Sequence, residues 1–217
     1  FRDLPGSDSV DDRATDAPAA PSALRAAEPL PPAFWGTSSG LHCLDVVVRS
    51  VLETGYSHHI TPLMVLSNLA TLLGVSPREL TDWFWVMYTD AFDWVVEPNV
   101  LGMGTFGAAD LMTTKPYVSG SAYINRMSDY CSGCAFDPRA DCPVTPFYWA
   151  FLERNEDRLQ DNPRMRLPLA SLRKRGEEQR RLDRMVTEWA AAELREGRPL
   201  QPADRPVATR SSPGAEP

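Results

Sequence analysis

The stretch CSGCAFDPRADCP, residues 131–143, places three of the chain's four cysteines in one short segment. Cys131 and Cys134 form a C-x-x-C pair, which puts two thiolates on one turn where both can ligate one iron or one zinc. Cys142 precedes a proline, an ending that recurs in bacterial cluster motifs. The fourth cysteine, Cys43, lies far upstream. We therefore predict one site of four thiolates that ties a distant helix to the C-terminal loop.

Two kinds of metal site use four thiolates, and spacing alone leaves both open. One is an iron–sulfur cluster, and the other is a structural zinc site. No secretory signal is visible and the first residue is Phe1, so we interpret the sequence as processed or truncated. In a reducing cytoplasm, the expected location, cysteines are ligands rather than disulfide partners.

Length and composition predict one domain with a sizeable core. The chain has 217 residues, of which 43% are hydrophobic. No apolar run reaches about 18 residues, so we expect no membrane partner. The net charge of -7 argues against a generally basic nucleic-acid binder. Residues 164–184 are locally rich in Arg and Lys, which indicates either a phosphate-facing patch or a solvated helix face.

Periodicity and boundary signals predict a mainly α fold. Apolar residues recur at helical spacing in 41–54, and Gly55 follows as a stop. The segment 76–79, Ser-Pro-Arg-Glu, is typical of a capping box with proline at the first helical position. Further helices are expected from Thr145-Pro146 onward and over about 177–196, whereas strand signals are weak throughout.

The remaining segments lack helical signals. Residues 1–30 are rich in Asp, Ala, Pro and Ser, and we predict that they are disordered or loop. Residues 199–217 form a Pro-rich polar stretch that we predict to be a disordered tail, which leaves 31–198 as the folded domain. Within it, 97–120 carries several Gly and Pro without a period, so we expect a long ordered loop of the kind that lines a site.

Six segments over about residues 30–175 resemble the C-terminal catalytic part of the bacterial iron–sulfur cryptochromes and photolyases, the prokaryotic (6-4) photolyase family. They are LPPAFW (30–35), GYSHHI (55–60), LMVLSNLATLLGVSP (63–77), DWFWVMYTDAFDWVVEPNVLGM (82–103), TTKPYVSGSAYINRMSDYCSGC (113–134) and CPVTPFYWAFL (142–152). The cysteine spacing matches as well. The resemblance implies a truncated helical FAD-binding domain of the photolyase/cryptochrome type, whose family members use blue light to repair (6-4) pyrimidine photoproducts in DNA.

The resemblance also implies the cofactors and the partner. It places a [4Fe–4S] cluster on the four cysteines and implies FAD, with an antenna chromophore only in an N-terminal domain that this sequence lacks. The implied partner is UV-damaged DNA, and a monomer is expected. The implied enzyme class is DNA photolyase, once the chain is completed by its N-terminal part.

Aromatic residues crowd the segment 83–94, and most of them suit an ordinary helical core. A photoreduced flavin also needs close redox-active aromatics, and by resemblance Trp35 and Trp83 match the family's relay positions. Phe84 stands where a relay tyrosine is common, and phenylalanine is not readily oxidised. Trp85 or Tyr88 could substitute for it.

The histidine pair is the candidate for lesion chemistry. An imidazole suits proton donation because its pKa lies near working pH, and the resemblance favours His59 as the donor. Adjacent helical positions point about 100° apart, so we expect His58 to pack inward instead. The family usually has a basic residue where Pro62 stands, and proline there predicts that the helix starts at this position.

Polar residues in the 97–123 segment are candidates for orienting a bound ring system. The resemblance assigns Tyr117 and Tyr123 to the lesion pocket and Asn99 to the flavin neighbourhood, and Lys115 is a further candidate for cofactor binding. Ordinary loop hydrogen bonding explains any one of them equally well.

Three other functions stay open. The chain could come from a cryptochrome-type blue-light photoreceptor without repair activity, because the same pocket serves both functions. It could be a zinc-stapled helical binding module. The missing N-terminal portion also allows a non-functional remnant of a truncated gene.

Overall fold

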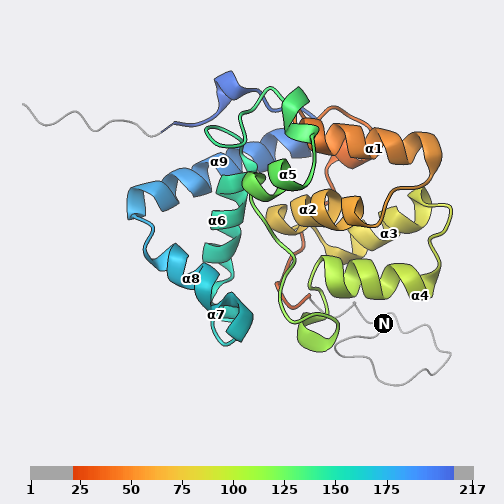
Figure 1. Cartoon of the computed structure of the whole chain (residues 1–217), viewed down its shortest axis with the longest axis horizontal. Coiled ribbons are helices and arrows are strands. Elements are labelled where there is room, and N and C mark those ends of the chain that lie inside the picture. Colours follow the sequence, from red (N-terminus) through yellow and green to blue (C-terminus); the bar gives the residue numbers. More distant parts are fainter. Residues whose placement is uncertain (1–21, 208–217) are drawn as a thin grey trace, which may run out of the picture.

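Residues 22–207 are described by a computed structural model, and over this range the chain is helical (Figure 1). The only extended pairing within these residues is an isolated parallel bridge between Glu28 and Val75. None of the described helices is both long and apolar enough to cross a membrane. The predicted mainly α fold is confirmed.

Helices of three kinds follow one another along the chain. The α-helices are α1 (His42–Thr54), α2 (Asn68–Leu73), α3 (Pro77–Met87), α4 (Asp93–Val96), α5 (Ser121–Met127), α6 (Val144–Arg154), α7 (Glu156–Leu159), α8 (Arg166–Arg173) and α9 (Glu177–Arg195). Two π-helices are η2 (Pro62–Ser67) and η3 (Glu97–Gly104). The 3-10 turns are η1 (Pro32–Trp35), η4 (Ala109–Leu111), η5 (Tyr130–Gly133), η6 (Pro163–Met165) and η7 (Pro202–Asp204).

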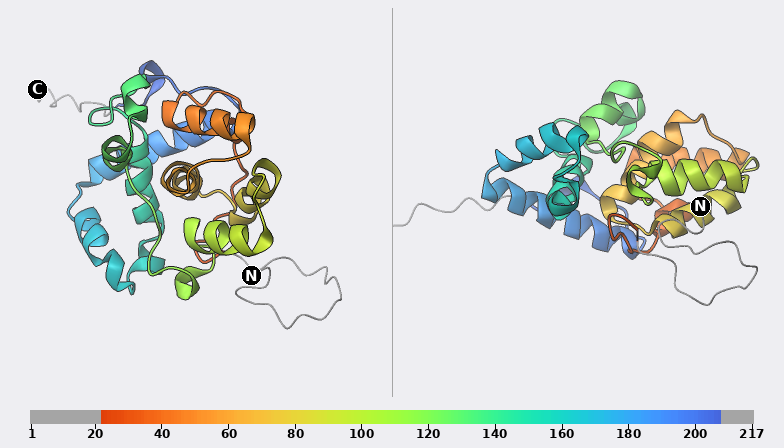
Figure 2. Two further views of the ribbon diagram at one scale, coloured as in Figure 1. Left: turned by 45° about the vertical axis from the view of Figure 1, so that its right-hand side comes forward. Right: turned by 90° about the horizontal axis from the view of Figure 1, so that it is seen from below.

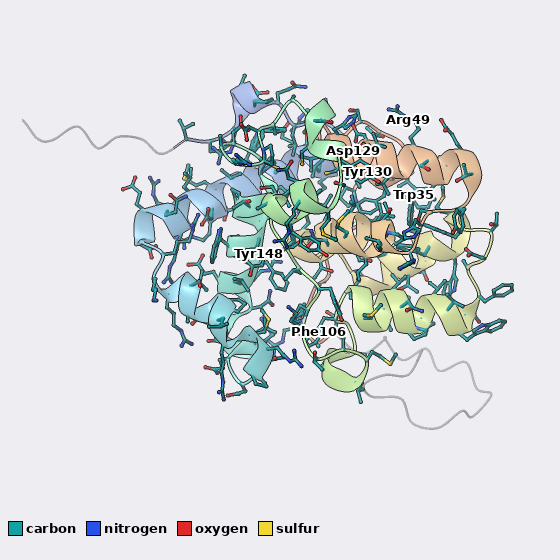
Figure 3. The ribbon with its side chains drawn as sticks, viewed as in Figure 1. Trp35, Arg49, Phe106, Asp129, Tyr130 and Tyr148 are labelled. Atoms are coloured by element: carbon teal, nitrogen blue, oxygen red, sulfur yellow. The ribbon has the colours of Figure 1, made fainter. Side chains whose placement is uncertain are left out.

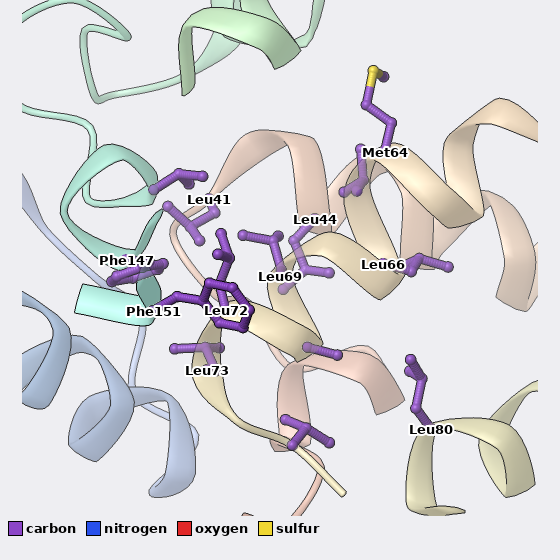
Figure 4. Packing of buried hydrophobic residues seen from close by; sticks show 14 of the residues in the cluster. Leu41, Leu44, Met64, Leu66, Leu69, Leu72, Leu73, Leu80, Phe147 and Phe151 are labelled. Carbon is purple, nitrogen blue, oxygen red and sulfur yellow. The ribbon is translucent and has the colours of Figure 1, made fainter. Parts of the chain in front are cut away.

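The helices form two groups that share one core. Figures 1 and 2 show α1 to α4 on one side, α6 to α9 on the other, and α5 between them. The groups meet where α2 packs against α6, as seen from close by in Figure 4. There Phe147 and Phe151, one turn apart on α6, lie beside Leu72 of α2, and all three side chains are fully buried.

Two helix boundaries follow the sequence signals directly. Gly55 ends α1 at φ 63°, and Pro77 begins α3 as predicted. The capping box is wrong, because the Ser76 side chain makes no cap hydrogen bond. Instead the Glu79 carboxylate accepts the Leu30 N–H at 2.6 Å, and the Ser76 N–H donates to the Glu28 carbonyl at 2.8 Å. The Glu79 carboxylate and the Ser76 N–H therefore bind the segment around residues 28–30 and do not cap the first turn of α3.

The prediction of a long loop over 97–120 is wrong for its first part, which is η3. Its glycines serve close helix packing and not a turn. A Cβ at Gly104 would lie 2.7 Å from Ser67 Oγ of η2, and one at Gly102 would lie 2.6 Å from Met112 Cγ. The chain runs without helix over residues 105–108, between η3 and η4, and again over residues 112–120.

The described chain ends are anchored. Within the segment predicted as disordered or loop, residues 22–30 form a loop whose Leu24 is buried, and residues 1–21 lie outside the described range. The predicted tail begins too early, because Leu200 is 1% exposed and its N–H donates to the Ser39 carbonyl at 2.9 Å. The folded part therefore extends past residue 198, and residues 208–217 lie outside the description.

Candidate functional site

The four cysteines come together around one apolar hollow between α1, α5, η5 and the start of α6. Cys43 stands in the first turn of α1, Cys131 and Cys134 belong to η5 and its C-terminal end, and Cys142 precedes α6. The rest of the lining is mainly apolar, and it includes Tyr130, which lies beside α1 in Figure 3. This shared lining places Cys43 beside the C-terminal loop that carries the other three cysteines.

Burial raises the pKa of several of these thiols. For Cys43 burial is the largest cause, and the neighbouring Cys142, Cys134 and Cys131 add to the rise. The pKa of Cys142 is raised to about 12, again mainly by burial, against a smaller lowering by the Val144 N–H. The Cys43 and Cys142 thiols are therefore neutral at physiological pH, and ligation of a metal would release their protons.

Local turns fix the positions of the later cysteines. The Asp137 carbonyl accepts the Cys142 N–H at 3.0 Å, and the Asp137 N–H donates to the Asp141 carboxylate at 2.6 Å. These bonds close the short connection between Cys134 and Cys142 into a tight turn. A residue that the sequence reasoning missed is His42, whose ring lies against Gly133, because a Cβ there would be 2.7 Å from His42 Nε2.

The donor chemistry fits a thiolate-bound group, since all four cysteines are free and line the same hollow. Among residues 22–207, however, no three His, Cys, Asp or Glu side chains form a group arranged to hold a metal ion. The choice between a cluster and zinc thus rests on metal analysis.

An aromatic cluster surrounds Trp83, the side chain expected to act in the electron relay. Trp83 is 1% exposed, and its Nε1–H donates to the Phe34 carbonyl at 2.8 Å. Its ring makes edge contacts with Phe34 and Phe84 at centroid distances of 5.7 and 5.2 Å. Tyr88 adds a third edge contact at 6.1 Å and stacks on Phe84 at 4.9 Å.

The other relay candidates differ in their surroundings. Trp35 ends η1 and is 53% exposed (Figure 3). Trp85 is half-buried, lies under the Arg78 guanidinium at 5.9 Å, and has no hydrogen-bond partner for Nε1 within the described residues. Of the two substitutes expected for a relay tyrosine, only Tyr88 joins the ring contacts of Trp83 within residues 22–207.

The histidines are arranged differently from the prediction. His58 and His59 are both exposed, and their ring centroids are 4.3 Å apart at an interplanar angle of 38°. The predicted inward packing of His58 is therefore wrong. The pair precedes η2, so the 100° rotation between helical neighbours does not apply. The dihedrals of Thr61 are already helical (φ -63°, ψ -45°), so the chain turns helical just before Pro62.

The candidate ring-orienting residues are spread over the surface. Tyr117 and Tyr123 are 42% and 37% exposed, and Lys115 is exposed too. Asn99 is exposed, and its amide donates to the Val95 carbonyl of its own helical segment at 2.7 Å. None of the four lines either described cavity.

Ion pairs occupy most of the basic segment 164–184. Arg175 bonds the buried Asp183 at 2.5 Å and stacks over Trp149 at 4.7 Å. This supports the helix-face interpretation of the segment over a phosphate-facing patch. Its other pairs are Arg173–Glu156, Arg180–Glu153, Arg181–Glu178, Arg184–Glu153 and Arg184–Glu177.

A comparison of the sequence with known proteins finds a related enzyme. A (6-4) photolyase of Agrobacterium fabrum is 38% identical over 156 residues, which is 70% of this chain. The chain belongs to the photolyase/cryptochrome family. It spans 31% of the length of that photolyase. No protein-family model matches.

A second relative matches over a shorter stretch of the chain. An uncharacterized protein of Acanthamoeba polyphaga mimivirus is 36% identical over 66 residues, or 30% of this chain and 54% of that protein. This photolyase/cryptochrome chain therefore corresponds to only part of each of the two relatives.

Proposed function

We propose that the chain is the C-terminal catalytic part of a flavoprotein that repairs (6-4) pyrimidine photoproducts in DNA by light-driven electron transfer. One observation carries the proposal: 38% identity over 156 residues to a (6-4) photolyase. The four cysteines around one hollow and the aromatic cluster around Trp83 support it.

We assign the four cysteines to a [4Fe–4S] cluster. Four free thiols from α1 and from the 131–142 segment line the same apolar hollow, which suits Cys₄ ligation. Ligation would join α1 to η5 and to the start of α6, so metal binding would add to the folding free energy. His42 would cover the backbone of the C-x-x-C turn.

FAD is proposed for the complete protein and not for this chain alone. When bound, the flavin supplies light absorption and electron donation. Of the chain's own residues, Trp83 is proposed as the electron relay, with Tyr88 as the neighbour through which the relay reaches the partly exposed end of α3. Trp35, already exposed, is the alternative exit.

The exposed histidine pair is proposed to face damaged DNA. His59 is the candidate proton donor, and its exposure leaves it accessible to an extruded base. Tyr117 and Tyr123 are partly exposed aromatics on which bases can stack.

Repair of a defined lesion tests the proposal. The chain, completed by an N-terminal part from a family member, is illuminated with an oligonucleotide that carries a single (6-4) photoproduct, and restored bases are measured by chromatography. We expect repair in the light and none in the dark, with His59→Ala inactive and the exposed Tyr56→Phe as a matched control. Light-driven flavin reduction without repair would favour the photoreceptor. The absence of both flavin reduction and repair would contradict the proposed function for this chain.

A further inference from the structure

The loop that carries the histidine pair, residues 55–61, is fastened to the C-terminal end of α3. Gly55 at its start accepts two hydrogen bonds from Thr89, from the N–H at 2.9 Å and from Oγ1 at 3.2 Å. The two residues touch closely, because a Cβ at Gly55 would lie 2.7 Å from Thr89 Cγ2. This contact fixes where the loop leaves α1.

A second attachment lies next to the histidines themselves. Ser57 Oγ and the Tyr88 hydroxyl are 2.7 Å apart in a partly buried hydrogen bond. Beyond it, the Thr61 N–H donates to the His58 carbonyl at 2.9 Å, which makes the turn into η2. Along the chain, the exposed histidine pair is therefore flanked by the Ser57–Tyr88 side-chain hydrogen bond before it and by the backbone turn into η2 after it.

The ring of Tyr88 is held as firmly as its hydroxyl. It stacks on Phe84 with an interplanar angle of 18° and meets the edge of the buried Trp83. Burial raises the pKa of Tyr88 to about 12, so the phenol stays protonated and keeps its hydrogen-bonding capacity at physiological pH. The Tyr88 hydroxyl therefore has a fixed position and can anchor the loop through its hydrogen bond to Ser57.

We infer that Tyr88 is a positioning residue for the histidine pair: through Ser57 it holds the loop so that His58 and His59 stay exposed with their rings together. The same side chain contacts Trp83, so it connects the aromatic cluster with the histidine loop. The catalytic meaning of this arrangement rests on the proposed function. The arrangement itself belongs to the chain and needs neither flavin nor DNA.

The test uses the purified chain alone. The variants Tyr88→Phe and Ser57→Ala each remove one hydroxyl and keep the rest of the packing. Ser57→Thr keeps a hydroxyl at the same place, and Tyr56→Phe removes an exposed hydroxyl from the same loop as a control. Two quantities are measured: the magnetization transfer between the His58 and His59 rings by NMR, with His42 as internal reference, and the amide hydrogen exchange of residues 57–61.

If Tyr88 positions the histidine pair, Tyr88→Phe and Ser57→Ala should loosen the loop to the same extent. The ring-to-ring signal should disappear, and loop amides should exchange about 2- to 10-fold faster, as expected for one lost hydrogen bond. The double variant should be no worse than either single one, and Ser57→Thr and Tyr56→Phe should match the parent. Exchange in α9 should not change, which separates a local effect from general destabilisation.

Two results would overturn the inference. One is an unchanged ring signal and loop exchange in both Tyr88→Phe and Ser57→Ala. The other is additive effects in the double variant, which would mean that the hydroxyls act independently. If Tyr88→Phe weakens the whole chain, the loop variant Ser57→Ala decides alone. Failed repair by the completed protein would refute the proposed function and leave these measurements standing.

Discussion

Replacing Trp83 by phenylalanine should destabilise the chain far more than an isolated relay residue would. The variant loses the indole N–H that bonds the Phe34 carbonyl at 2.8 Å, in a site where both residues are buried. An unpaired buried carbonyl costs about 1–3 kcal/mol. Weakened edge contacts with three aromatic rings cost about 0.5–1.5 kcal/mol more. Together we expect the free energy of unfolding to fall by about 1.5–4.5 kcal/mol.

Urea unfolding followed by far-UV circular dichroism measures this loss. With a slope of about 3 kcal/mol/M, the midpoint should fall by about 1 M. The matched control is Trp85→Phe, because the Trp85 Nε1–H has no hydrogen-bond partner within residues 22–207. Its removal should change the midpoint little or raise it. Equal midpoints for Trp83→Phe and the parent, or an equal loss in the control, would refute the reasoning.

Three further outcomes follow from other parts of the structure. The pKa of Tyr88 is raised to about 12 in the fold from an ordinary value of 10.0, so its contribution to stability is complete below pH 10 and is lost as the pH rises through 12. Tyr88→Phe should reduce this alkaline loss in thermal melts, and an unchanged alkaline slope would contradict it. Leu200→Ala should cost about 2–5 kcal/mol because Leu200 is 1% exposed, whereas no loss would return residue 200 to the tail. Gly104→Ala should lower the free energy of unfolding by more than about 1 kcal/mol, the cost of a mild overpacking, because the new Cβ would meet Ser67. A neutral result would mean that η2 and η3 can separate freely.

The sequence predicted well those elements whose signals are local. The limits of α1 follow from an apolar period and a glycine with positive φ, and α3 begins at a proline. The convergence of four cysteines was also predictable, because a prediction of one shared site requires that they meet. In each case a single physical requirement acts on neighbouring residues or on one residue type.

Features that depend on distant packing were not predictable in the same way. Gly102 and Gly104 look like loop residues, but they are small because Met112 and Ser67 press against them. The histidine pair was placed by helical geometry, although a bond between Ser57 and Tyr88 from another element holds the loop. The polar neighbours of Leu200 predict a tail, yet its N–H donates to the Ser39 carbonyl and its side chain is buried in the core.

The metal content of the chain tests the central claim most directly. The chain is purified without oxygen, and iron, zinc and acid-labile sulfide are measured per chain beside the visible spectrum. We expect a brown protein with about four irons per chain, and loss of iron and colour in Cys142→Ala but not in Ser132→Ala, an exposed position within the C-x-x-C turn. One zinc and no iron in the parent chain would contradict the central claim.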